Sequence, residues 1–327
     1  MNRLKVKKTY KEIGGYFELE IPKSSANNVL LRSGRAAFQF ILSKLNPEHV
    51  MLPYFACEVL RVTLDHVGIS YELYALDENL EIKNEIKSDA TYLYINYFGL
   101  KRDYSASLSE ALGNKLILDN THDLFWPSLK TNLSPSFNSL RKFIGVPDGA
   151  EVIMDDEKRQ DMCQLEHSRE SHLEHLVTRL EASAQAGYQA YVKNEATFDH
   201  TIKRSSAISE QIFDAIDRKN ISQRRRSNYL KLHNHLAMSN ALSRNVLELK
   251  KDHVPFSYPY LPKNELKHEQ LWNQNIFAPR LWPECNDFEN FSYESNLAQK
   301  TIHLPIDHRY DNGDMQYLIE VINHHGK

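Results

Sequence analysis

The chain has 327 residues, 41% of them hydrophobic, which suits about two ordinary domains with substantial apolar cores. Its 40 lysines and arginines nearly balance 43 aspartates and glutamates, which argues against nucleic acid or an anionic membrane surface as the partner. Three isolated cysteines give no disulfide framework and no zinc motif, and no stretch approaches the ~18 apolar residues of a membrane span. We expect a cytoplasmic protein with a small-molecule partner, no metal and no contact with nucleic acid or membrane.

Short apolar runs alternate with amphipathic stretches over the first 150 residues. Apolar residues at 37, 40, 41 and 45 recur at helical spacing, whereas the runs between such stretches are typical of strands. Strands that alternate with helices indicate a mostly parallel sheet covered by helices, an α/β fold. The expected strands are 29–31, 50–52, 71–76, 92–96 and 115–118, and the expected helices are 33–45, 59–66 and 105–112.

Residues beyond 150 form a different pattern, charged and helix-prone at first and alternating again near the end. Residues 155–200 predict long surface or interface helices, because apolar residues at 173, 176, 180 and 184 share one helical face. A smaller C-terminal α/β domain fits the remainder. The expected elements are helices 208–215, 222–242 and 314–324, and strands 246–249, 277–282 and 301–305.

Three polar features follow expected strands: the turn at Ser33-Gly34-Arg35, Asn96 and Asp119. Ligands of open parallel sheets bind outside the carboxyl ends of the strands, so we expect these groups to share one cleft. Gly34 at a helix N-terminus lets backbone N–H groups approach an anion closely, which suits a phosphate. The alternative is that Ser33 is an ordinary helix N-cap.

Asp119 ends an otherwise apolar strand, so its carboxylate needs a cationic or hydrogen-bonding partner. With His122, three residues later, it could bind a metal, act in catalysis or cap a helix. The stretch SPSFNSLRKF alternates like a strand and carries Arg141 and Lys142. Lys142 is the candidate for chemistry, because a guanidinium stays protonated, whereas an amine of lowered pKa forms Schiff bases with aldehydes.

A phosphate turn, an aspartate and a lysine together suit pyridoxal phosphate. Over most of its length the sequence resembles the DegT/DnrJ/StrS family of nucleotide-sugar aminotransferases. The segments that carry the resemblance are, in chain order, GGYFELE, LLRSGRAAFQFIL, VMLPYFACEVL, INYFG, LILDNTHDLF, SFNSLRKFIGVPDGA and IHLPIDHRY. The resemblance implies fold type I: a large domain over 1–225 with a mostly parallel sheet, and a smaller C-terminal α/β domain over 226–327.

The resemblance also implies roles for three residues. Lys142 would form the Schiff base with pyridoxal phosphate, Asp119 would pair with the pyridine nitrogen, and His122 would face the ring hydroxyl. The first turn glycine follows the family's lysine by seven residues, as Gly149 follows Lys142. The distance from the Ser-Phe pair to the lysine is one residue longer than usual, so a count from that end alone would select Arg141.

Further cofactor contacts follow from the same motifs. Gly34 and Arg35, largely through their backbone, and Ser136 would hold the phosphate. Asn96 follows the strand that ends beside the ring. The resemblance implies an aromatic side chain stacked on the ring. The motif spacing of the family places that side chain at Cys57, which is not aromatic, so we assign the contact to the nearby Phe55.

Two remaining features lie in the C-terminal third. The L-P-x-H resemblance of IHLPIDHRY implies that His308 lines the mouth of the substrate site. The run at 224–226, three arginines, begins a helix and indicates a solvated or salt-bridged face rather than a nucleic-acid patch.

The function implied is a pyridoxal-phosphate aminotransferase that moves an amino group, from glutamate as donor, onto a nucleotide-linked keto sugar. Fold type I relatives build their sites between subunits, so we expect a homodimer. One alternative is a sugar dehydratase that uses the same cofactor. The other is a non-catalytic relative that keeps the fold as a binding module.

Overall fold

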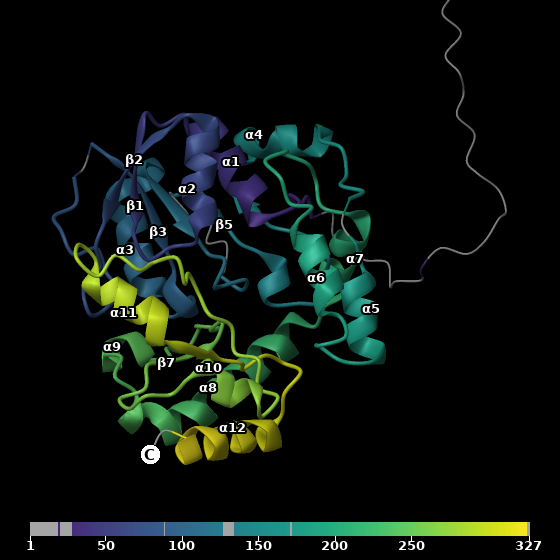
Figure 1. The fold of residues 1–327 in the computed structure, drawn as a ribbon. Helices are drawn as coiled ribbons and strands as arrows, with labels where there is room; N and C mark the ends of the chain where they lie inside the picture. Colours follow the sequence, from purple (N-terminus) through teal and green to yellow (C-terminus); the bar gives the residue numbers. More distant parts are fainter. Residues whose placement is uncertain (1–18, 20–27, 88, 127–133, 171, 326–327) are drawn as a thin grey trace, which may run out of the picture.

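Alternating strands and helices build the N-terminal half of the chain (Figure 1). The computed structural model describes residues 19, 28–87, 89–126, 134–170 and 172–325, so most of the GGYFELE segment lies outside the described residues. Six strands form one sheet in the order β2-β1-β3-β4-β5-β6, and β6 is the antiparallel member. The strands are β1 (His49–Pro53), β2 (Ser70–Tyr74), β3 (Thr91–Ile95), β4 (Leu116–Asp119), β5 (Ser136–Phe137) and β6 (Val152–Ile153).

Local signals fix the helices next to this sheet. The hydroxyl of Ser33 accepts a hydrogen bond from the Ala36 amide at 3.2 Å, so α1 (Gly34–Leu45) begins where the sequence predicts. Gly68, at φ 73°, ends α2 (Glu58–Val67). Helix α1 packs against α2 and against β5, and α3 (Arg102–Leu112) packs against β4. The predicted α/β class with a mostly parallel sheet is confirmed.

The C-terminal part has its own two-stranded antiparallel sheet, β7 (Tyr258–Tyr260) with β8 (Ile302–Leu304). In Figure 1 this small sheet lies below the larger one. Helix α8 packs against β7, and α12 packs against α8 on the side away from the large sheet. One apolar core joins both sheets. The helices after the large sheet are α4 (Asp156–Arg159), α5 (Glu174–Glu181), α6 (Tyr188–Glu195), α7 (Ala207–Ala215), α8 (Arg218–Leu236), α9 (Arg244–Leu247), α10 (His268–Trp272), α11 (Ser292–Lys300) and α12 (Asn312–His325).

Four predicted elements are wrong. Residues 29–31 do not form a strand, and only Leu31 makes isolated bridges, with Ala150 and Arg204. Residues 246–249 do not form a strand, because Ser243 caps a helical turn by accepting from the Val246 amide at 3.2 Å. Residues 277–282 are irregular, since Pro279 has no N–H to donate and Trp282 has a φ of 54°. Residues 155–200 form the short helices α4, α5 and α6 rather than long ones.

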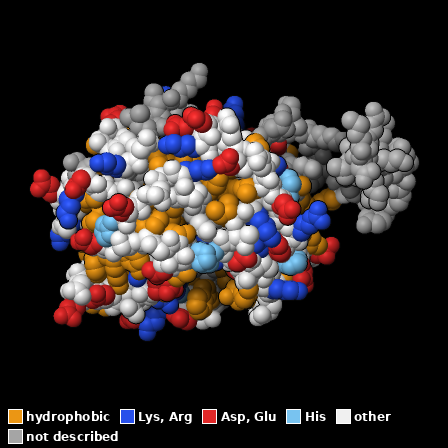
Figure 2. Space-filling model, turned by 90° about the horizontal axis from the view of Figure 1, so that it is seen from above, with side chains coloured by type: hydrophobic (Ala, Val, Ile, Leu, Met, Phe, Trp, Pro, Cys, Tyr) orange, Lys and Arg blue, Asp and Glu red, His pale blue; other side chains and the backbone are white. Residues whose placement is uncertain are grey.

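The molecular surface carries both charges. Figure 2 shows acidic and basic side chains interspersed over one face, with hydrophobic side chains between them. None of the helices in the described ranges is long and apolar enough to cross a lipid bilayer. Residues 225 and 226, at which the two domains were predicted to meet, lie within α8, and the domain boundary stays a prediction.

Gly99 offers a direct test of how the segment after β3 fits against the segment after β4. Its φ is 74°, and a Cβ at this position would lie 2.4 Å from the carbonyl oxygen of His122. We expect Gly99→Ala to lower the free energy of unfolding by about 3 kcal/mol, because a left-handed backbone and a backbone clash combine. Urea denaturation measures the loss.

Gly68→Ala is the matched control. Gly68 has a φ of 73°, but no atom lies within 4 Å of an added Cβ. Only the backbone term remains, so we expect a loss of about 1 kcal/mol. Equal losses in the two variants would contradict a close approach between Gly99 and His122.

Candidate active site

Lys142 extends from a single helical turn that follows β5. The structure limits the predicted strand to Ser136–Phe137 and forms a 3-10 turn over Leu140–Lys142. The Lys142 amine donates to the hydroxyl of Thr121 at 3.2 Å and lies 5.9 Å from the centre of the Phe256 ring. Burial lowers the pKa of Lys142, and the nearby Asp119 partly opposes that shift. The lysine therefore gives up its proton more readily than a solvated one.

Arg141 points to a different environment from Lys142. Its guanidinium pairs with the carboxylate of Glu195 and lies 4.3 Å from the centre of the Phe198 ring. The structure thus places the amine of Lys142, and not the guanidinium of Arg141, beside Asp119. This placement agrees with the choice that the sequence makes on chemical grounds.

Asp119 ends β4 and is 5% exposed. Its carboxylate accepts from the amide of Thr121 at 2.8 Å. Burial raises the pKa of Asp119, while Lys142 and the Thr121 hydrogen bonds oppose the rise. The parallel pairing of Asp119 with Phe137 brings the ends of β4 and β5 together. Sequence analysis did not single out Thr121, although it lies within the LILDNTHDLF motif.

His122 is fully buried within an aromatic layer. Its ring stacks on Phe256 with centroids 4.7 Å apart, and its Nδ1 accepts from the Phe98 amide at 3.3 Å. Its Nε2 has no hydrogen-bond partner within the described residues. Burial lowers the pKa of His122 well below its usual value, helped by the charge of Lys142, so the ring is neutral.

The predicted phosphate contacts lie next to the same groups. A Cβ on Gly34 would lie 3.6 Å from Thr121 Cγ2, so the N-terminus of α1 packs directly against Thr121. The hydroxyl of Ser136 is buried and, among the described residues, has no partner. The guanidinium of Arg35 donates to the Phe198 carbonyl, which leaves its backbone as the part near the α1 terminus.

Two predicted cofactor contacts have partners in the protein interior. Asn96 is fully buried, donates to Asp123 Oδ2 at 3.0 Å and accepts from the Lys101 amide at 2.9 Å, so its amide holds the chain after β3. Phe55 is also fully buried and packs edge-on against Trp282 with centroids 4.5 Å apart. Both assignments as cofactor contacts stay predictions.

Cys57 is the residue near Phe55 that does approach the centre. Lys142 and Asp119 are both among the charges that act on its thiol, and burial raises the pKa of that thiol. The assignment of the stacking contact to Phe55 stays a prediction.

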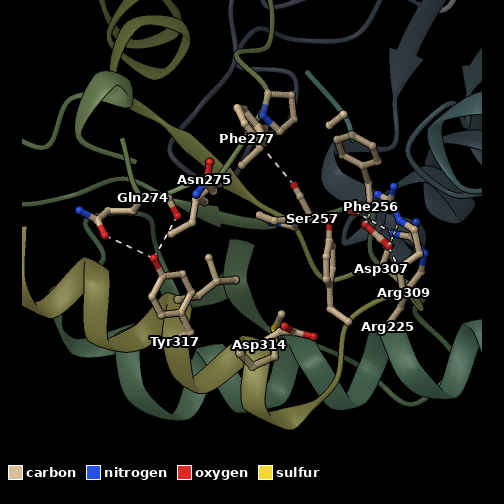
Figure 3. A pocket seen from close by; sticks show the side chains of 18 of the residues that line it. Arg225, Phe256, Ser257, Gln274, Asn275, Phe277, Asp307, Arg309, Asp314 and Tyr317 are labelled. Atoms are coloured by element: carbon tan, nitrogen blue, oxygen red, sulfur yellow. Dashed lines mark hydrogen bonds and ion pairs between the residues drawn. The ribbon is translucent and has the colours of Figure 1, made fainter. Parts of the chain in front are cut away.

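A cavity of about 540 Å³ opens beside Lys142 (Figure 3). Most of its lining comes from the C-terminal part and from α12. Figure 3 shows two polar groups on different sides of it, one around Asp307 and Arg309 and the other around Gln274, Asn275 and Tyr317. Within the described ranges, no group of three or more His, Cys, Asp and Glu side chains could hold a metal ion.

Arg225 lines this cavity and is 2% exposed, so it departs from the solvated face predicted for the arginine run, whereas Arg224 is exposed as predicted. Its guanidinium donates to the carbonyl of Phe256 at 2.9 Å and to that of Pro255 at 3.3 Å. Burial lowers the pKa of Arg225 to about 10, and Asp307 partly opposes the shift. The aromatic and apolar residues of α8 are the sequence pattern that indicates a buried face; the arginines do not indicate one.

Asp307 replaces His308 at the cavity. His308 does not line it, whereas Asp307 and Arg309 do, and Arg309 pairs with Asp307 at 2.7 Å. In the sequence Leu304-Pro305-Ile306-Asp307, the aspartate stands where the L-P-x-H motif has its histidine. The histidine of this chain comes one residue later. The role of His308 at the mouth of the substrate site stays a prediction.

His303, from the middle of β8, also lines the cavity and was missed by the sequence analysis. Its side chain lies 3.3 Å from the Ser257 hydroxyl, and burial lowers its pKa to about 3. A neutral imidazole beside Lys142 can accept or donate a hydrogen bond without adding charge.

Comparison with solved structures identifies the fold. Spr1654, a proposed sugar aminotransferase of Streptococcus pneumoniae in its PMP form, is 13% identical, with a TM-score of 0.67 over 91% of this chain and 87% of that one. DesV of S. venezuelae, in complex with a ketimine intermediate, is 15% identical, with a TM-score of 0.63 over 91% and 84%.

A third similar structure is a mutant of GDP-4-keto-6-deoxymannose-3-dehydratase (ColD) with bound GDP-perosamine. It is 13% identical, with a TM-score of 0.62 over 90% of this chain and 87% of that one. No protein-family model and no curated protein matches the sequence. The chain has the fold of these sugar-modifying enzymes, and the predicted fold type I architecture is confirmed.

His303 predicts part of the pH dependence of stability. The folded protein keeps the ring neutral down to about pH 3, whereas the unfolded chain binds a proton below its ordinary value of about 6.5. This contribution to stability is present above pH 6.5 and is lost as the pH falls. Between pH 7 and pH 5 this contribution to the free energy of unfolding falls by about 2 kcal/mol. Over the same range we expect the free energy of unfolding of His303→Gln to fall by about 2 kcal/mol less than that of wild type.

Urea denaturation at several pH values measures the two profiles. His200→Gln is the control, because His200 is partly exposed and should change the pH slope less. Parallel profiles for wild type and His303→Gln would contradict a buried neutral ring.

Proposed function

We propose that this protein is a pyridoxal-phosphate aminotransferase of the DegT/DnrJ/StrS family. Its acceptor is a nucleotide-linked keto sugar, and glutamate is the amino donor. The observation that carries the proposal is the amine of Lys142 beside a cavity, joined through Thr121 to the buried Asp119. The fold shared with sugar aminotransferases supports it.

The residues around Lys142 suit this cofactor. Ser136 Oγ and His122 Nε2 are buried polar atoms without partners in the described part of the chain. Buried polar groups normally have partners, so these two atoms indicate that a polar ligand supplies the missing ones. A phosphate would be held by Ser136 and the N-terminus of α1 at Gly34 and Arg35, and His122 would face the ring.

When bound, pyridoxal phosphate supplies an aldehyde that condenses with amines and a ring that accepts electron density from the substrate carbon. Lys142 would hold the cofactor through its amine, and the same Nζ, once free, would accept a proton from the substrate carbon and return it as general base and acid. Asp119 would keep a negative charge that favours a protonated ring nitrogen. The lowered pKa of Lys142 favours the neutral amine that both tasks need.

The cavity supplies the recognition groups for the substrate. Arg225 and Arg309 would bind anionic groups, and the side chains at 274, 275 and 317 would hydrogen-bond hydroxyl groups. We also propose a homodimer and a domain boundary at 225/226. Exposed apolar side chains on α5 and α6, next to the cavity-lining Arg179, support the dimer; they are Val177, Leu180, Tyr188, Tyr191 and Val192.

A dehydratase is the second candidate, favoured by the similarity to the dehydratase structure with bound GDP-perosamine. Both reactions begin with a cofactor held in the same cavity, so product analysis separates them. An amino sugar supports the aminotransferase, and a deoxy sugar without nitrogen supports the dehydratase.

The first test is the site of covalent attachment. We expect pyridoxal phosphate and borohydride to modify Lys142 alone, because its amine reaches the cavity next to Asp119. Lys142→Ala should remove the modification while the protein stays folded. Mass spectrometry of peptides locates the modified lysine.

The control moves the amine by one residue. The double variant Arg141→Lys with Lys142→Ala keeps a lysine in the same turn, but position 141 faces Glu195 and Phe198. We expect no modification of this variant. Modification at position 141 would show that the choice of lysine is wrong.

Asp119→Asn tests the electrostatic role of the aspartate. The amide keeps the shape of the side chain but not the charge, so the proton on the ring nitrogen is lost. We expect kcat to fall by about 100-fold, for a loss of about 3 kcal/mol, while the cofactor still binds. Unchanged kcat with a lowered Tm would instead show that Asp119 is a structural residue.

A further inference from the structure

Thr121 occupies a special position between the two charged residues of the site. Its hydroxyl oxygen accepts from the Lys142 amine at 3.2 Å, and its backbone amide donates to the carboxylate of Asp119 at 2.8 Å. Thr121 therefore forms a bridge between the two charged groups, the amine on its hydroxyl and the carboxylate on its amide.

The bridge replaces a direct ion pair. Within the described ranges, no ion pair of 4 Å or less joins Lys142 to Asp119. Both charges are desolvated, as the opposite shifts of their pKa values show, and an unpaired buried charge is costly. The Thr121 hydroxyl gives the amine an acceptor, and the Thr121 amide gives the carboxylate a donor.

Packing fixes the orientation of Thr121. Its amide donates to Asp119 Oδ1 at 2.8 Å, which sets the backbone, and its methyl group faces Gly34, whose Cβ would lie 3.6 Å from it. Because threonine is branched at Cβ, placing the methyl group also places the hydroxyl. The side chain is 9% exposed, so water competes little for these hydrogen bonds.

We propose that Thr121 is the positioning residue of Lys142. Its hydroxyl holds the amine at the cavity end, close to Asp119, before any cofactor binds. The consequence for cofactor binding rests on the proposed function: an amine that is held in place attacks an aldehyde faster than one that samples many rotamers.

Two rates measured on the same variants test the proposal. The first is acetylation of Lys142 by acetic anhydride in the cofactor-free full chain, followed by mass spectrometry over a range of pH. The second is formation of the covalent adduct with pyridoxal phosphate. Thr121→Val keeps the shape and removes the hydroxyl, whereas Thr121→Ser keeps the hydroxyl.

In Thr121→Val the ammonium loses an acceptor, so the neutral amine becomes more common and acetylation at a given pH should rise by about 3- to 10-fold. Adduct formation should fall by about 10-fold in the same variant, because the amine is no longer held. Thr121→Ser should stay within about twofold of wild type in both rates. The other titratable groups whose charge affects the pKa of Lys142, or whose pKa Lys142 affects, are Cys57, Arg141, His122 and His303. All four residues are kept in every variant.

Wild-type rates in a folded Thr121→Val would overturn the proposal. If Thr121→Val does not fold, the comparison of Thr121→Ala with Thr121→Ser gives the same decision. If wild type forms no adduct with pyridoxal phosphate, the proposed function fails, but the acetylation profiles still decide the role of Thr121.

Discussion

The parallel pairing of β4 with β5 is the constraint on which the site depends. It sets Asp119 opposite Phe137, and the turn that follows β5 then brings Lys142 back to Thr121. Because parallel strands end on the same edge, the carboxylate and the amine meet where the N-terminus of α1 also lies. A shift of one residue in this pairing would turn alternate side chains to the other face and separate the charges.

Burial then gives these groups their chemical character. Desolvation raises the pKa of Asp119 and lowers those of Lys142 and His122, so each group is poised closer to neutrality than in water. The C-terminal part adds Arg225 and His303 from one side of the cavity. The large sheet and the turns that follow its strands thus supply Asp119, His122 and Lys142, and the smaller sheet and its helices supply most of the cavity wall.

The sequence predicts the parts of the site that depend on local signals. Strand ends, the N-cap at Ser33 and the chemistry of lysine against arginine lead to Gly34, Asp119 and Lys142, and the structure places these three close together. It does not predict contacts made between distant segments: Arg225 looks solvated because two more arginines flank it, yet its guanidinium lies 4.4 Å from the centre of the Phe143 ring and donates to the carbonyl of Phe256. Irregular segments are also not predicted from the sequence, because only the fold shows that residues 277–282 have no strand partner.

The most direct test of the account is a single half-reaction without any sugar. The purified protein, loaded with pyridoxal phosphate, is mixed with glutamate, and both the visible absorbance and the 2-oxoglutarate released are followed. Transamination from glutamate predicts loss of the absorbance with release of about one equivalent of 2-oxoglutarate per bound cofactor. Stable absorbance with no 2-oxoglutarate would contradict the proposed transamination from glutamate.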